Sequence, residues 1–241
     1  ENVHAFFLLA FCFKMLYNHD ERDNTMNVLS IDFDYFQLAT IDQFKRYPTG
    51  IDRTATESEK VWSETYKLNP DLCSVKLNTT EYHKLIRLIK RQPADIPVMI
   101  VNSHVEIYDF IHDHVDVNEK LNITHIDMHD DFYNDNPCLD CGNWLRFIAD
   151  EYKNLGFIWI SNPVSADVYG FDTSDEKIRK IMPTVLDCSM KNKYDLIFLC
   201  RSDTWLPPHL DSAFTDLCRV IQNRFTNLDI RNDITTPRKI A

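Results

Sequence analysis

Short apolar runs that alternate with longer amphipathic segments are the feature that most constrains the fold of this chain. Several runs are apolar at successive positions, as in VMIV, FIWI and LIFL, rather than at every second position. Successive apolar residues are typical of strands that are buried on both faces of a parallel sheet. The predicted strands are Asn27–Phe33, Pro97–Asn102, Asn122–Asp127, Phe157–Ser161 and Tyr194–Cys200.

The segments between these strands have helical patterns. The predicted helices are Glu57–Tyr66, Glu81–Arg91, Val105–His112, Trp144–Leu155, Asp175–Met182 and Leu210–Arg224. Strands that alternate with helices predict an α/β fold, here a three-layer α/β/α sandwich around a mainly parallel sheet. Ligands of such sheets bind outside the carboxyl ends of the strands, so we expect the functional residues there.

The chain is expected to form a single domain from Met26 onward. No repeat, low-complexity segment or Pro/Gly-rich linker divides residues 26–241. Before this domain, the apolar run Ala5–Tyr17 is interrupted by Lys14 and is too short to cross a membrane, which takes about 20 residues. We expect residues 1–25 to be a dispensable extension, and a helix packed on the domain is the alternative.

The composition excludes several classes of ligand. A net charge of −11 disfavours nucleic acid and anionic membranes as partners and suits a cationic ligand. With only four glycines, neither a GxGxxG loop nor a P-loop can be assembled. Seven cysteines, an odd number in a chain long enough to fold without disulfides, predict reduced thiols and a cytoplasmic location.

The strongest metal-binding candidate follows the strand Asn122–Asp127, which runs into the sequence DMHDD. Alternation along an extended chain places Asp127, His129 and Asp131 on one side. Carboxylates packed that closely repel one another or raise one another's pKa unless a cation lies between them. The pattern therefore predicts a metal site.

Two other predicted strands end in similar side chains. Asp32 and Asp34 share one face after the first strand, and His104 follows the second. A strand-to-loop turn and a hydrogen-bonded histidine are the structural alternatives, and the shared sheet edge favours metal binding. The predicted ligands are Asp32, Asp34, His104, Asp127, His129 and Asp131. Four carboxylates and two imidazoles suit two Mn²⁺ ions, and a metal pair can deprotonate a bridging water.

These motifs resemble those of the ureohydrolases, which include arginase and agmatinase, and of the related deacetylases. The motif SIDFD comes first here and last in arginase, and CGNWL follows DMHDD. This order resembles a circularly permuted arginase-like family that includes the bacterial peptide arginases, over roughly Met26 to Ser212. The resemblance implies an arginase/deacetylase-like fold and two Mn²⁺ per chain. It also implies that a metal-bridging hydroxide cleaves arginine, in a peptide or another guanidino substrate, to ornithine and urea.

The resemblance also implies roles for individual residues. Asp127 and Asp32 would bridge both ions, and Asp127 and His129 would belong to the catalytic group. The remaining ligands would complete the two sites as pairs, His104 with Asp131 and His129 with Asp34. Asn143 and Trp144 of the CGNW segment would contact the substrate.

Two departures from the arginase pattern matter. Leu145 stands where arginase has a histidine, so the motif identifies no proton shuttle. The carboxylate that would hold the guanidinium group is not placed by any motif either. Asp203 is the first candidate and Glu106 the second, and a solvated loop acid or a helix N-terminal charge is the alternative.

Other functions remain open from the sequence. A deacetylase-type amide hydrolase could use one metal held by Asp127, His129 and Asp34, and a binding protein could keep the fold without turnover. Cys138 and Cys141 form a lone CxxC, for which a loop over the active site is preferred to redox chemistry or zinc. Oligomeric state and natural substrate are not determined by the sequence.

Overall fold

The computed structural model describes residues 25–50, 52–133, 136–165 and 191–240. Its centre is a six-stranded, all-parallel sheet with the strand order β6-β5-β1-β7-β4-β8. The strands are β1 (Thr25–Asp32), β4 (Val98–Val101), β5 (Lys120–Asp127), β6 (Leu155–Ser161), β7 (Leu196–Cys200) and β8 (Leu228–Ile230). A separate antiparallel pair consists of β2 (Gln37–Leu38) and β3 (Lys76–Leu77).

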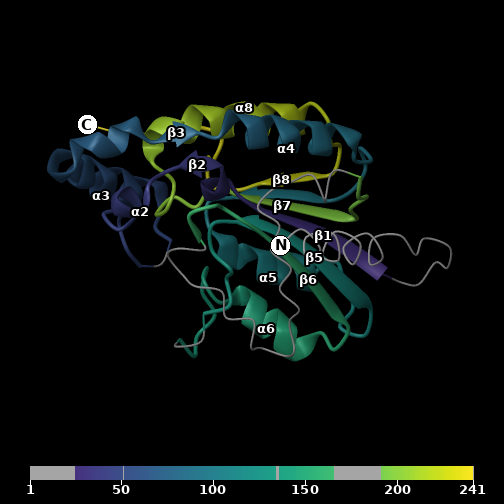
Figure 1. Cartoon of the computed structure of the whole chain (residues 1–241). Coiled ribbons are helices and arrows are strands. Elements are labelled where there is room, and N and C mark those ends of the chain that lie inside the picture. Colours follow the sequence, from purple (N-terminus) through teal and green to yellow (C-terminus); the bar gives the residue numbers. More distant parts are fainter. Residues whose placement is uncertain (1–24, 51, 134–135, 166–190, 241) are drawn as a thin grey trace, which may run out of the picture.

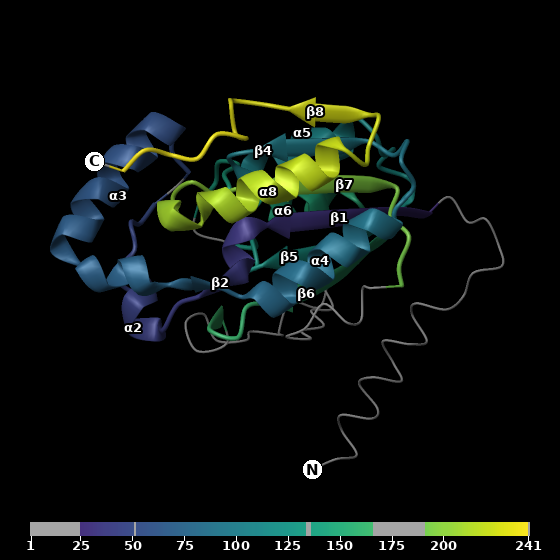
Figure 2. The ribbon, with the colours of Figure 1, turned by 90° about the horizontal axis from the view of Figure 1, so that it is seen from above.

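Helices cover both faces of the sheet, which confirms the predicted three-layer α/β/α fold (Figure 1). One face is covered by α4 (Thr79–Arg91) and α8 (Asp211–Gln222), and the other by α5 (Ile107–His112) and α6 (Trp144–Glu151). Two further helices, α2 (Ile41–Phe44) and α3 (Ala55–Leu68), lie beyond the carboxyl ends of the strands (Figure 2). Short 3-10 helices are η1 (Phe33–Phe36), η2 (Pro70–Ser74), η3 (His104–Glu106) and η5 (Pro208–Leu210).

Alternation along β1 divides the core into two clusters. Leu29 and Ile31 pack on the side of α4 and α8, whereas Val28 packs on the side of α5 and α6. Ser30 shares the side of Val28 because side chains alternate along a strand, and it is fully buried. A polar residue is thereby placed on a side of the sheet that is lined mostly by apolar side chains.

The register of the sheet brings the ends of four strands, β1, β4, β5 and β7, level with one another. Ile31 pairs with Ile126 of β5, and Asp32 pairs with Cys200 of β7. Cys200 also pairs with Val101 of β4. The residues that follow β1, β4 and β5 therefore meet at one edge of the sheet.

Most predicted elements are present, with differences at their ends. The helix predicted at Trp144–Leu155 stops at Glu151, because Leu155 already begins β6 and the Tyr152 hydroxyl is tied to the carbonyl of Val115 at 2.9 Å. Strand β8 was not predicted, since its three residues alternate and carry no long apolar run. The predicted helix Asp175–Met182 and residues 1–24 lie outside the described residues. None of the described helices is both long and apolar enough to cross a membrane.

Arg238 ties the C-terminal segment to the rest of the domain. Its buried guanidinium group donates to both carboxylate oxygens of Asp211, at 2.6 and 2.8 Å. It also donates to Ser58 Oγ at 2.7 Å and to the carbonyl of Leu206 at 2.7 Å. The segment after β8 is therefore held by buried, charge-assisted hydrogen bonds.

We predict that Arg238→Ala lowers the free energy of unfolding by about 3–5 kcal/mol, because buried Asp211 would keep only its longer ion pair with Arg201, at 3.8 Å. Urea unfolding followed by tryptophan fluorescence measures the loss. The control is Arg219→Ala, which removes an exposed ion pair with Asp216 and should cost less than about 1 kcal/mol. Equal losses in the two variants would contradict this account of the C-terminal segment.

Candidate metal centre

Buried carboxylates and imidazoles meet at the carboxyl edge of the sheet. They come from the end of β1 and η1, from the start of η3 after β4, and from β5 with the loop that follows it. All six predicted ligands are part of this cluster, and the structure adds His125, which the sequence analysis did not select. The members are Asp32, Asp34, His104, His125, Asp127, His129 and Asp131.

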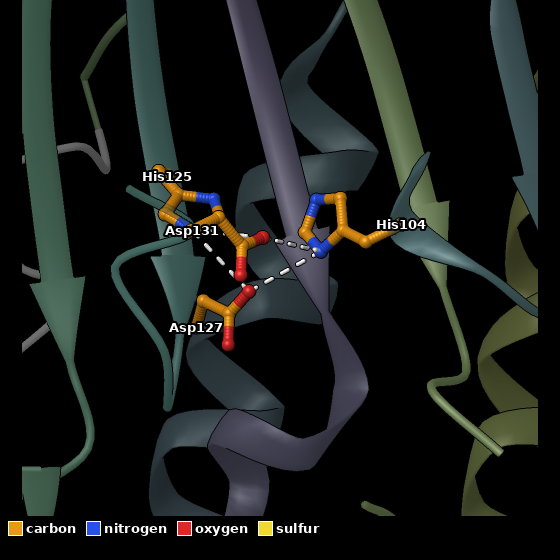
Figure 3. A group of neighbouring side chains, drawn as sticks. All are labelled: His104, His125, Asp127 and Asp131. Atoms are coloured by element: carbon orange, nitrogen blue, oxygen red, sulfur yellow. Dashed lines mark ion pairs between the residues drawn. The ribbon is translucent and has the colours of Figure 1, made fainter. Parts of the chain in front are cut away.

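The first group of ligand atoms contains His104, His125, Asp127 and Asp131 (Figure 3). His104 Nδ1 lies 3.2 Å from Asp127 Oδ2 and 3.3 Å from Asp131 Oδ2. His125 Nε2 lies 3.2 Å from the same Asp127 oxygen. One ligand atom from each residue lies within 4.8 Å of all the others, so the group can hold a metal ion.

The second group contains Asp34, Asp127 and His129. His129 Nδ1 lies 3.1 Å from Asp34 Oδ2 and 3.4 Å from Asp127 Oδ1. Asp127 therefore directs one oxygen toward each group. The side chain of His129 is 17% exposed, whereas the ligands of the first group are buried, so the second group lies nearer to solvent.

Asp32 contacts the first group through His104. Its Oδ2 lies 3.2 Å from His104 Nδ1, and its Oδ1 accepts a hydrogen bond from the Asp34 amide at 3.1 Å. Cys200 lies close enough to complete a third possible set with Asp32 and His104.

The loop after β5 is not extended, so the alternation used in the sequence analysis holds only up to Asp127. Asp131 has a φ of 51°, in the left-handed region that aspartate tolerates better than most residues. This turn separates His129, which joins Asp34, from Asp131, which joins His104. The predicted ligands meet, but a turn rather than strand alternation places the last two.

Crowding and burial shift the pKa values of the carboxyl groups. Burial, followed by the neighbouring charges of Asp32 and Asp127, raises the pKa of Asp34 well above its usual value. Burial and the charge of Asp127 do the same to the pKa of Asp131. Burial opposes ionisation of Asp127 as well, but the nearby imidazoles, His125 first, lower its pKa below the usual range.

The two buried imidazoles differ in charge. Burial would lower the pKa of His104, but the neighbouring carboxylates of Asp127, Asp131 and Asp32 outweigh it and raise the pKa well above its usual value. Burial lowers the pKa of His125 to about 3, so this ring is neutral.

The donor set fits a divalent cation. Asp34 Oδ2 and Asp127 Oδ2 are buried and have no hydrogen-bond partner among the described residues. A buried polar atom without a partner costs about 1–3 kcal/mol, and a cation between the carboxylates would offset that cost and their repulsion. Carboxylate oxygens with imidazole nitrogens suit Mn²⁺ or a similar ion.

The two residues of the CGNW segment that were implied as substrate contacts are buried. Trp144 donates from Nε1 to Asp131 Oδ2 at 2.5 Å, and its ring stacks on His104 with centroids 5.4 Å apart. Asn143 holds its own loop, since its amide oxygen accepts from the Asp140 amide at 2.8 Å and its nitrogen donates to the Cys138 carbonyl at 2.8 Å. In this structure Trp144 supports two ligands of the first group.

The two candidate carboxylates for a guanidinium group are paired with arginines of the chain. Asp203 binds Arg201 in a buried ion pair at 2.5 Å. Glu106 binds Arg231 at 2.8 Å. Both negative charges are therefore already offset.

Asp52 is a carboxylate at the site that the sequence analysis missed. Its Oδ2 accepts from the backbone amide of His104 at 3.3 Å, while its Oδ1 is buried without a hydrogen-bond partner among the described residues. Burial and then the charge of Asp32 raise its pKa to about 6. Its charge also acts on Cys141 of the CGNW segment. No local signal could have found Asp52, because it lies in a loop between helices, outside any strand end.

Comparisons with protein-family models, curated proteins and solved structures find no match to this chain. The resemblance to the permuted arginase-like family stays a prediction, and the metal centre is the basis for assigning a function.

We predict that Mn²⁺ stabilises the protein more at pH 8 than at pH 5. The raised pKa values of Asp34, Asp131 and His104 mean that a bound cation must displace protons, so its affinity rises with pH. Without metal, the raised pKa values of Asp34 and Asp131 make the folded state bind more protons than the unfolded state. The contribution of these two carboxyl groups to the free energy of unfolding therefore falls as the pH rises above about 4.

Thermal unfolding with and without Mn²⁺ at each pH measures the difference. A shift in midpoint that is equal at the two pH values, or larger at pH 5, would contradict the prediction.

Proposed function

We propose that this chain is a binuclear manganese hydrolase that cleaves the guanidino group of an arginine side chain, in a peptide or another guanidino compound, to urea and ornithine. The observation that carries the proposal is the position of Asp127, whose two carboxylate oxygens face two different groups of ligand atoms. A carboxylate in that position is suited to bridging two ions.

The residues assigned to each ion follow from the two groups. His104, Asp131 and Asp127 Oδ2 would hold one ion, and Asp34, His129 and Asp127 Oδ1 the other. Divalent cations lower the pKa of water that they coordinate, which supplies a nucleophile at neutral pH. In the overall reaction the water oxygen bonds to the guanidinium carbon and the bond from that carbon to Nε breaks. Both water protons end on Nε, which leaves as the ammonium group of ornithine while the carbon becomes that of urea.

The cationic substrate would be held by Asp52. Its Oδ1 is buried without a partner, and it lies on the backbone of His104, next to the first group. A guanidinium group donates two parallel hydrogen bonds to a carboxylate, and this interaction would offset the cost of the unpaired oxygen. The net charge of −11 also favours approach of a cation.

A single-metal amide hydrolase of the deacetylase type is the second candidate. Asp34, Asp127 and His129 form a complete three-residue group by themselves, and three protein ligands with an open position are typical of catalytic zinc. One tightly bound Zn²⁺ and release of acetate from acyl-amine substrates would favour this function.

A binding protein without turnover is the remaining alternative. Its support is Leu145, which stands where arginase has a histidine, is fully buried and has no group that can transfer a proton. Release of urea from any guanidino substrate would exclude it.

We predict two Mn²⁺ per chain in the wild-type protein and loss of both urea release and one or both ions in Asp127→Asn. Substitution of the shared carboxylate removes a ligand from both groups and should reduce turnover by at least about 10³-fold. Metal analysis after gel filtration and a colorimetric urea assay make the measurement.

The matched control is Asp130→Asn, since Asp130 lies in the same loop and the asparagine can still accept the hydrogen bond from the Phe132 amide. It should keep both ions and the activity. An Asp127→Asn protein with wild-type metal content would overturn the binuclear assignment.

We predict that Asp52→Asn raises the KM for an arginine substrate by about 10–100-fold, the range expected for loss of one charge-assisted hydrogen-bond pair, with a smaller effect on kcat. Asp109→Asn is the control, because it removes the same charge from an exposed position on α5. If the two variants have the same KM, Asp52 does not hold the substrate.

A further inference from the structure

We infer that Ser30 and His125 form a hydrogen-bond relay that fixes the ring tautomer of His104 and turns the His125 N–H group toward Asp127. Both are then positioning residues, and His125 is not a metal ligand although it lies among the ligand atoms of the first group. The inference rests on the metal-binding part of the proposed function and is independent of the substrate.

Ser30 lies between the two buried imidazoles. Its Oγ is 2.7 Å from His104 Nε2 and 3.1 Å from His125 Nδ1. All three side chains are at most 1% exposed, so water does not compete for these contacts. Within the part of the chain that the structure describes, Ser30 Oγ has no other hydrogen-bond partner.

The number of protons sets the direction of the relay. A neutral imidazole that offers Nδ1 to a cation carries its proton on Nε2. His104 Nε2–H then donates to Ser30 Oγ. The single hydroxyl proton of Ser30 is left to donate to the one remaining neighbour, His125 Nδ1.

The proton count also determines whether His125 Nε2 carries a proton or a lone pair where it faces the carboxylates. If its Nδ1 accepts from Ser30, the proton of the neutral ring lies on Nε2, which is 3.2 Å from Asp127 Oδ2 and 3.7 Å from Asp131 Oδ2. His125 therefore turns an N–H group, and not a lone pair, toward these oxygens, within ion-pair distance of Asp127 Oδ2. An imidazole that carries a proton on this nitrogen cannot bind a cation through it.

The opposite arrangement, in which both imidazoles offer lone pairs to a cation, is disfavoured. His104 and His125 would then both donate to Ser30, and its hydroxyl proton would have no acceptor among the described residues. A buried hydroxyl without an acceptor is unfavourable. One serine between two histidines thus lets only one of them act as a ligand.

Aromatic side chains hold the planes of both rings. Phe198 stacks on His104 at 5.3 Å and 16°, and Trp144 stacks on the same ring at 5.4 Å and 22°. Trp144 meets His125 edge-on at 5.4 Å, and Phe157 lies 5.8 Å from it. A half-turn of His104 within its plane would put ring carbons where Nε2 now meets Ser30 Oγ and Nδ1 meets Asp32, so Ser30 is the group that selects the tautomer.

The direct test is the protonation pattern of the two rings in protein loaded with Zn²⁺, which is diamagnetic, read from histidine ¹⁵N chemical shifts by NMR. We expect the proton on Nε2 in both His104 and His125. A proton on His125 Nδ1, with Nε2 bound to metal, would overturn the relay.

Variants give an independent readout. Ser30→Ala should weaken Mn²⁺ binding by about 10–100-fold, as is usual when a group that supports a ligand is lost, while two ions per chain still bind at saturation. Ser161→Ala is the matched control, because Ser161 is also fully buried, at the end of the neighbouring β6, and its hydroxyl has no partner among the described residues. Ser30→Ala with wild-type affinity would contradict the relay.

His125→Asn separates a positioning residue from a ligand. We expect this variant to bind two ions with reduced affinity, and loss of one ion would make His125 a ligand and refute the relay.

The failure of this inference can be told from that of the proposed function. A wild-type protein that binds no divalent cation refutes both. A wild-type protein with two ions and a metal-bound His125 Nε2 refutes the relay alone.

Discussion

Repulsion between buried carboxylates is the constraint on which the arrangement of the metal centre depends. Asp32, Asp34, Asp127 and Asp131 meet in a space from which water is largely excluded, and burial acts to raise the pKa of each of them. Only at Asp127 do the nearby imidazoles outweigh burial and lower the pKa. Such a set is stable only when positive charge or protons offset the repulsion. The imidazoles supply part of that compensation, and a divalent cation at each ligand group would supply the rest.

The sheet provides the rigidity that this crowding requires. β1 lies between β5 and β7, so Asp32 and Asp34 at its end are held at the centre of the sheet. Trp144 connects the CGNW segment to the ligands through a hydrogen bond to Asp131 and a stacking contact with His104. Other acidic residues near the site, such as Asp203 and Glu106, are neutralised by arginines. Asp52 has no such partner for its Oδ1, which makes it the candidate for contact with a cationic substrate.

The sequence predicted which side chains meet at the sheet edge but not how the chain brings all of them together. Successive apolar residues identified the buried strands, and the polar residues after them were therefore expected at one sheet edge. Alternation placed Asp127 correctly, but the left-handed turn at Asp131 was not predictable from an extended-strand pattern. His125 was overlooked because it lies inside the strand β5, although it is spaced two residues before Asp127 and so faces the same side.

The sequence by itself determined the fold class and which strand ends carry metal-type ligands, because apolar periodicity and residue chemistry are local properties of the chain. Only the tertiary structure decided how the ligands divide into two groups, which carboxylates are already paired with arginines, and where Ser30 lies. These features depend on contacts between residues far apart in the chain, such as Ser30 with His104 and His125. Strand register and loop geometry set those contacts, and no local pattern encodes them.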